Sequence, residues 1–322
     1  MEKLLPSIPD DSVDYHARRN HFSSWFMARS EVMLASKLKP VKVSDFASVE
    51  ALKHYLVRCI HDRRKGIQRG VITEMFEGRF DPDADFIKIG RGSLGGKARG
   101  LAFASTLLRS HPELHENFKG VDIRVPKTLA ISTEGFDAFV AENNLREFAT
   151  REAGDAEIAA AFLSARLPEW LARNLAVFVE HTTCPLAVRS SSLLEDAQFQ
   201  PFAGIYRTYM LPNNDPDRAG RLERLIAAVK LVYASTYFES PKSFARSTYH
   251  RIAEEKMAVA VQHLTGAAWG GHFFPALAGV VQSYNFYPIA HMKPDEGIAH
   301  IALGLGKMVV EGGTSLRFSP KY

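Results

Sequence analysis

The stretch PLAVRSSSLLEDAQFQPFAG, residues 185–204, joins a short apolar run to a cation and three hydroxyl groups. Residues 186–188 favour a buried strand, and Arg189 follows them at the point where a strand end can hold a charge over a cleft. The serines at 190–192 add small polar side chains beside a guanidinium group, which is a natural partner of phosphate oxygens. The stretch therefore predicts a strand that ends at a nucleotide phosphate site.

A second phosphate-binding pattern lies upstream, in the sequence GRGSLGGK of residues 90–97. Residues 86–89 before it favour a short strand, and residues 98–109 after it favour a helix. A glycine-rich loop, a helix N-terminus and Lys97 can together hold phosphate through backbone amides, the helix dipole and a point charge.

The sequence of this loop leaves a Rossmann domain as an alternative, because its glycines at 90, 92 and 95 match the dinucleotide-binding fingerprint. Two features count against that alternative: Lys97 follows Gly96 at once, and no regular strand, helix, strand succession with a placed acidic residue comes next. The Walker A pattern fails, because Arg91 stands where a glycine is needed and Ala98 where Ser or Thr is needed.

The chain before residue 85 favours helices. A first helix is expected to bury one side and a second to begin at Ser44 or Ser48, ending in the basic run 63–65, which we interpret as a solvated helix end. The apolar residues of the first helix are Trp25, Phe26, Met27, Val32, Met33 and Leu34. The turn-rich residues 81–85 predict a boundary between this segment and the rest.

The remaining chain alternates strands and helices. Thr133 is expected to cap a helix after a strand over 123–131, and a long packing helix is expected over 222–237. Further helices are expected over 156–179, and further strands over 206–211, 257–262, 278–282 and 298–303. Strands that follow one helical stretch indicate an α+β architecture, not a second repeating βαβ domain.

Composition limits the class of protein. The 322 residues suggest about two domains, and 46% hydrophobic with 24% charged residues is typical of a soluble globular chain. A net charge of +4 suits anionic small molecules but gives no basic stripe for nucleic acid, and two cysteines indicate a reducing compartment. Residues 257–292 lack charged Asp, Glu, Lys or Arg, but their glycines and prolines favour two buried strands over a membrane span. We expect a cytoplasmic protein without membrane or nucleic-acid partners.

The motifs described above, and several others, follow one another in the order seen in a known family. The chain resembles the ATP-binding, N-terminal domain of the phosphoenolpyruvate synthase and pyruvate phosphate dikinase family. The resemblance runs from about residue 86 to the C-terminus and rests on several short motifs. They are Gly95-Gly96-Lys97, Val125-Pro126 with Ser132-Thr133, Val188-Arg189-Ser190-Ser191, Glu195-Asp196, Phe202-Ala203-Gly204, Ala260-Val261-Gln262, and Gly304-Leu305-Gly306 with Val309-Val310.

The resemblance implies an α+β, ATP-grasp-like fold that binds Mg-ATP between two lobes. It places Lys97 and Arg189 on the phosphates as catalytic cations and Gln262 at the hinge beside the adenine, with Gly95, Gly96, Thr133, Ser190 and Lys307 as further nucleotide-binding residues. The expected units are a helical extension over 1–84 and a nucleotide domain over 85–322, with lobes over roughly 85–190 and 191–322.

In the family, ATP phosphorylates a histidine on a separate domain, and the Thr-Gly-Gly-x-Thr-Ser-His signature of that domain does not occur in this sequence. The phosphoryl-accepting histidine is therefore expected elsewhere in a longer chain or in trans. We expect the chain to be a fragment of a longer enzyme or half of a split one. A non-catalytic nucleotide sensor remains the alternative.

One departure from the family concerns the metal. Lys307 stands directly after Gly-Leu-Gly, where the family usually has a carboxylate that the resemblance implies as a Mg²⁺ ligand. A charged lysine cannot ligate magnesium. Glu311 could supply the missing oxygen if this segment is helical, or Lys307 could contact phosphate directly, or it could lie on the surface.

Overall fold

A computed structural model describes residues 1–68, 71–76, 80–151, 153–192, 204–247, 251–289, 291–310 and 313–321. Its centre is a six-stranded sheet with the strand order β1-β2-β3-β6-β4-β5. These strands are β1 (Ile72–Met75), β2 (Phe86–Ile89), β3 (Thr128–Ile131), β4 (Leu186–Ser192), β5 (Thr208–Leu211) and β6 (Met257–His263). β1, β2 and β3 are parallel, whereas β6 is antiparallel to both of its neighbours. The α+β class is confirmed, and the mixed sheet differs from the parallel sheet of a Rossmann domain.

The sheet joins strands that lie far apart in the sequence. β6 inserts between β3 and β4, with Gln262 opposite Thr128 on one side and Ala187 on the other. β1 precedes residue 84, where the helical extension was expected to end, and it pairs with β2. The sheet therefore contains strands from all three predicted sequence ranges, whose boundaries stay predictions.

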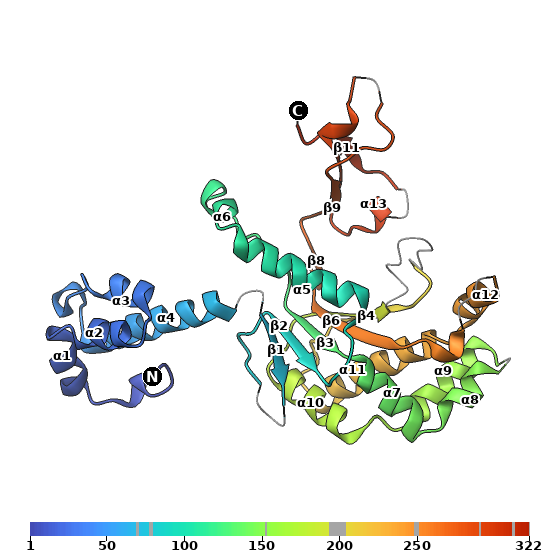
Figure 1. Ribbon diagram of the computed structural model, residues 1–322, viewed down its shortest axis with the longest axis horizontal. Helices are drawn as coiled ribbons and strands as arrows, with labels where there is room; N and C mark the ends of the chain where they lie inside the picture. Colours follow the sequence, from blue (N-terminus) through green and yellow to red (C-terminus); the bar gives the residue numbers. More distant parts are fainter. Residues whose placement is uncertain are drawn as a thin grey trace.

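Helices cover both faces of this sheet (Figure 1). α5 (Gly95–Ser110) packs against β4 and β6 on one face. The other face carries α7 (Thr133–Glu142), α9 (Asp155–Ser164), α10 (Glu169–Glu180) and α11 (Arg218–Ser235), with α8 (Leu145–Thr150) and α12 (Glu239–Ser247) beside them. The main core lies on this second face, and its largest side chains are fully buried aromatics: Phe136, Phe139, Phe162, Tyr233 and Tyr237. Burial of each of the three phenylalanine side chains stabilises the fold by roughly 1.5–3 kcal/mol.

The core under α5 is thin and built from small side chains. Ala98 and Ala102 of the helix meet Ala130 of β3 and Ala260 of β6, with Phe86 and Leu94 at the edge. Because an alanine adds only a methyl group, the helix can lie close to the strands. This close approach brings the start of α5 to β4.

The N-terminal segment folds around a core of its own and lies to one side of the sheet in Figure 1. It consists of α1 (Asp10–Arg18), α2 (His21–Ala28), α3 (Val32–Leu38) and α4 (Val49–Gln68). The prediction of one long first helix is wrong, because left-handed residues at Asn20 and Ser30 (φ 56° and 61°) turn the chain twice. The prediction of a Ser48 cap is confirmed, because its Oγ accepts the amide of Ala51 at 3.1 Å.

The sequence predicted that the basic run at the end of α4 is a solvated helix end, and this prediction is wrong. The Arg64 guanidinium bonds to carboxylate oxygens of Glu2 (2.9 Å), Asp81 (2.9 Å) and Asp83 (2.5 Å), and Arg63 pairs with Glu31 at 2.8 Å. The hydrogen bond to Glu2 is the main reason that the pKa of Arg64 is raised. These contacts tie the N-terminal helices to the loop before β2.

The C-terminal part forms a separate antiparallel sheet of β9 (Leu277–Gln282), β10 (Ile298–Leu303) and β11 (Leu316–Phe318). A hairpin of β7 (Ala267–Trp269) and β8 (His272–Phe274) precedes it. The prediction of two buried strands in the uncharged stretch is correct for β6 but wrong for β9, where Val281 is 66% exposed. β9 to β11 stand above α5 in Figure 1, away from the main core. None of the helices in the described ranges has the length and hydropathy needed to cross a bilayer.

β6 ends at His263, whose ring lies near that of Phe178, with centroids 6.3 Å apart. Burial, assisted by the charge of Lys127, lowers the pKa of His263 to about 4. An unfolded histidine titrates near pH 6.5. Between these two values the unfolded chain binds a proton that the folded chain does not, so the stability that neutral His263 contributes is complete above about pH 6.5 and falls as the pH drops toward 4.

We therefore expect the wild type to lose about 2 kcal/mol more unfolding free energy than His263→Gln between pH 7 and 4.5, measured by urea denaturation. His272→Gln, at an exposed position on β8, is the matched control and should keep the wild-type pH dependence. Parallel pH profiles of the wild type and His263→Gln would contradict this expectation.

Candidate phosphate site

The glycine-rich loop enters α5 at Gly95, directly against β4. Gly95 has a φ of +71°, and a Cβ atom there would lie 1.5 Å from the backbone oxygen of Ser191. The Ser191 hydroxyl donates to the Leu94 carbonyl at 2.7 Å and accepts the Ala98 amide at 3.0 Å. Only glycine fits this contact, and Ser191 fixes the junction of loop and helix to the strand.

Lys97 lies on α5 and Arg189 on β4, the two elements that meet at this junction. The Lys97 ammonium donates to the Ser190 hydroxyl at 3.4 Å, and Arg189 Nη1 lies 3.5 Å from Gln262 Oε1 on β6. Ser190 is fully buried and Gln262 is 9% exposed, so strand packing fixes both partners. The structure thus brings together the predicted residues of the loop, β4 and β6.

A shallow depression of about 700 Å³ opens at this junction. The described residues that line it include three cations, and they are Gly96, Lys97, Arg99, Gly100, Leu101, Phe103 and Arg189. The positive end of the α5 dipole faces the same place.

The first amides of α5 have no acceptor inside the helix, so their hydrogen bonds must be made elsewhere. That of Gly95 reaches the hydroxyl of Ser93, whereas that of Gly96 has no acceptor among the described residues. The Ala98 amide, which a regular helix would bond to the Leu94 carbonyl, reaches the Ser191 hydroxyl instead. This combination of cations and an available amide is suited to a polyanion such as a phosphate chain.

Thr133 does not cap α7 in the way that the sequence suggested. Ser132 is the N-cap residue and Thr133 is the first helical residue, without a capping bond from either side chain. The Thr133 hydroxyl instead accepts the amide of Ser93 at 3.2 Å, and its own amide donates to the Ser93 carbonyl at 2.9 Å. Thr133 therefore holds the glycine-rich loop, while direct contact with a nucleotide stays a prediction.

The closing segment lies elsewhere. Lys307 is exposed at the start of α13 (Lys307–Val310), which packs on β9 and β10 (Figure 1). Its predicted role at phosphate stays a prediction. Glu311, the acidic pair 195–196 and residues 202–203 lie outside the described residues.

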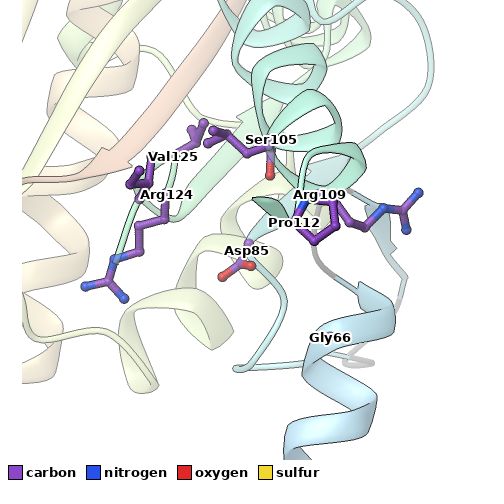
Figure 2. A pocket seen from close by; sticks show the side chains of 9 residues that line it. Gly66, Asp85, Ser105, Arg109, Pro112, Arg124 and Val125 are labelled. Carbon is purple, nitrogen blue, oxygen red and sulfur yellow. The ribbon is translucent and has the colours of Figure 1, made fainter. Parts of the chain in front are cut away.

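A further cavity lies at the other end of α5 (Figure 2). It measures about 200 Å³ and is lined by residues that include Asp85, Ser105, Arg109 and Arg124. Figure 2 shows the Arg109 and Arg124 guanidinium groups pointing away from one another, so they do not converge on a ligand. Ser105 lies eight residues beyond Lys97, or roughly 12 Å along a helix, so this cavity is separate from the phosphate site.

Sequence reasoning missed two roles at the site. Ser191 stood in the quoted serine run, but its contact with Leu94 and Ala98 depends on the fold. Glu134 was recognisable only as an acidic residue in the first turn of a helix, whereas its carboxylate accepts the amide of Arg91 in the loop.

Comparison with known proteins agrees with this geometry. The family model described as pyruvate phosphate dikinase, AMP/ATP-binding domain, matches residues 91–320. The chain is also 29% identical over 191 residues to the uncharacterized phosphotransferase YvkC of Bacillus subtilis (strain 168), an alignment that covers 59% of this chain and 20% of that relative. The chain thus spans about a fifth of that relative's length. Because the family model matches more than two thirds of the 322 residues, including the loop, α5, β4 and β6, this chain belongs to the pyruvate phosphate dikinase AMP/ATP-binding domain family.

Proposed function

We propose that this chain binds Mg-ATP with its phosphates in the depression between α5 and β4, and donates a phosphoryl group to a histidine of another domain. The observation that carries the proposal is the convergence of Lys97 and Arg189 at the N-terminus of α5. Membership of an AMP/ATP-binding family supports the choice of nucleotide. The acceptor histidine would lie in a longer chain or in a separate protein.

The proposed roles follow from charge. Phosphoryl transfer depends mainly on positioning and on neutralising the phosphate oxygens, with little covalent work for the protein. Lys97 supplies a compact point charge, and Arg189 supplies a planar fork that matches phosphate geometry. The Gly96 amide adds a neutral hydrogen-bond donor at the same place, and the α5 dipole adds a partial positive charge.

The proposal places the adenine near Gln262, at the end of β6, and makes β9 to β11 the second lobe. Mg²⁺ would arrive bound to the phosphates of ATP. Glu311 is the proposed protein ligand to the metal, and Lys307 is proposed to approach the phosphates. Lys307 is also what favours the second candidate, a nucleotide sensor without transfer, because it stands where the family usually has a carboxylate.

The phosphate contacts can be tested by calorimetry. Lys97→Ala and Arg189→Ala should each weaken Mg-ATP binding at least tenfold, because each removes a charge-assisted hydrogen bond to phosphate. Arg173→Ala removes an exposed cation from α10, on the opposite face of the sheet, and should bind like the wild type. Unchanged affinity in both site variants would contradict the assignment.

Phosphoryl transfer separates the enzyme from the sensor. Incubating this chain with γ-labelled and β-labelled ATP and a phosphohistidine domain of a related phosphotransferase should give an acid-labile label on that domain. Lys97→Ala should lower the initial rate at least tenfold, since a clamp on the phosphates is lost. Tight Mg-ATP binding without any label on the acceptor would favour the sensor.

A further inference from the structure

The first turn of α7 holds the glycine-rich loop through four hydrogen bonds. Glu134 accepts the Arg91 amide, and the Ser132 hydroxyl donates to the Arg91 carbonyl. Two more bonds join the backbone and hydroxyl of Thr133 to Ser93, at 2.9 and 3.2 Å. The N-cap residue of α7 and its first two helical residues therefore bind both polar backbone groups of Arg91 and Ser93.

The loop packs closely on the same turn. Gly90 has a φ of +78°, and a Cβ atom there would lie 2.8 Å from Ser132 Oγ and 3.1 Å from Glu134 Oε2. Gly92 has a φ of +91°, and its Cβ would lie 2.8 Å from Thr133 Oγ1. Glycines in this region have wide conformational freedom in isolation, so these contacts select one loop shape from many.

α7 is a rigid support for this purpose. Phe136 and Phe139 anchor it in the main core with no exposed surface, and the Ser132 amide bonds to the Ile89 carbonyl of β2 at 3.0 Å. At its far end the loop is fixed by Ser191 of β4, as described above. The loop is thus held on both sides, and Lys97 follows the second fixed point by two residues.

We propose that Ser132, Thr133 and Glu134 are positioning residues that set the shape of the glycine-rich loop for the phosphates of the nucleotide. The inference rests on the proposed function, because the loop needs this shape only if phosphate binds at the Gly96 amide and Lys97. Glu134 acts through its hydrogen bond to the Arg91 amide and not through contact with the ligand. A misplacement of about 1 Å in such a site can cost as much as a hundredfold in rate.

If these residues position the loop, their removal should weaken the binding of ligands that carry phosphates and leave the binding of adenosine nearly unchanged. Glu134→Ala removes the acceptor for the Arg91 amide and leaves the core of α7 intact, so calorimetry should show Mg-ATP affinity falling about tenfold. Adenosine lacks phosphates, and its affinity should stay within about twofold of the wild-type value. Thr133→Val removes the acceptor for the Ser93 amide at nearly constant volume and should give the same pattern.

A conservative variant tests whether Glu134 acts through its hydrogen bond or through its charge. Glu134→Gln keeps an oxygen acceptor and should restore Mg-ATP affinity to within about threefold of the wild type. Glu142→Ala removes another exposed carboxylate, at the far end of α7, and should bind like the wild type.

The possible outcomes distinguish a failure of the proposed function from a failure of the positioning role. A wild type that does not bind Mg-ATP would remove the proposed function itself. A wild type that binds, together with a Glu134→Ala variant that binds equally well, would overturn the positioning role alone. A parallel loss of adenosine affinity, or a Glu134→Gln variant as weak as Glu134→Ala, would also overturn it, because the first indicates a general structural defect and the second a requirement for charge.

Discussion

The contact between Gly95 and Ser191 is the constraint on which the site depends. Backbone meets backbone there, at a separation that leaves no room for a side chain. The contact is possible because alanines on both α5 and the strands keep the helix close to the sheet. It is fixed because the Ser191 hydroxyl bridges the Leu94 carbonyl and the Ala98 amide, two groups that would bond to each other in a regular first turn. Lys97 owes its place beside β4 to this junction.

The site gathers positive charges. Lys97, Arg99 and Arg189 are the cations among the described residues that line the depression. Like charges in proximity repel, and partial burial strengthens the repulsion by lowering the local dielectric constant. The large aromatic core on the opposite face of the sheet offsets this cost, so the stability of the fold and the chemistry of the site occupy different faces. A polyanion such as a phosphate chain would relieve this repulsion.

Local sequence patterns predicted the parts of the fold that depend on local physics. The glycine-rich loop, β2, β4 and α5 follow from apolar runs, turn residues and glycine spacing, and the structure contains each of them. The insertion of β6 between β3 and β4 is a long-range pairing that no local pattern encodes. The sequence pattern predicts one helix where the structure has α1, α2 and α3. The left-handed turns at Asn20 and Ser30 interrupt the helical pattern without a glycine or proline to mark them.

The same distinction holds within the site. The residue types and neighbours of Lys97 and Arg189 marked both as candidates for phosphate binding, and the structure places both at one depression. Thr133 was expected to cap its helix, and only the fold turns its hydroxyl toward Ser93. Residues that act by holding other residues carry weak sequence signals, because their partners lie tens of positions away in the chain.

The most direct test of this account is Mg-ATP binding by Gly95→Ala. The added methyl group must displace either the loop or β4, so we predict that calorimetry detects at least a tenfold loss of affinity while circular dichroism shows the helices retained. Gly66→Ala adds a methyl group to α4 in open space and should bind as the wild type does. Wild-type affinity in Gly95→Ala would contradict the claim that the close contact between α5 and β4 builds the nucleotide site.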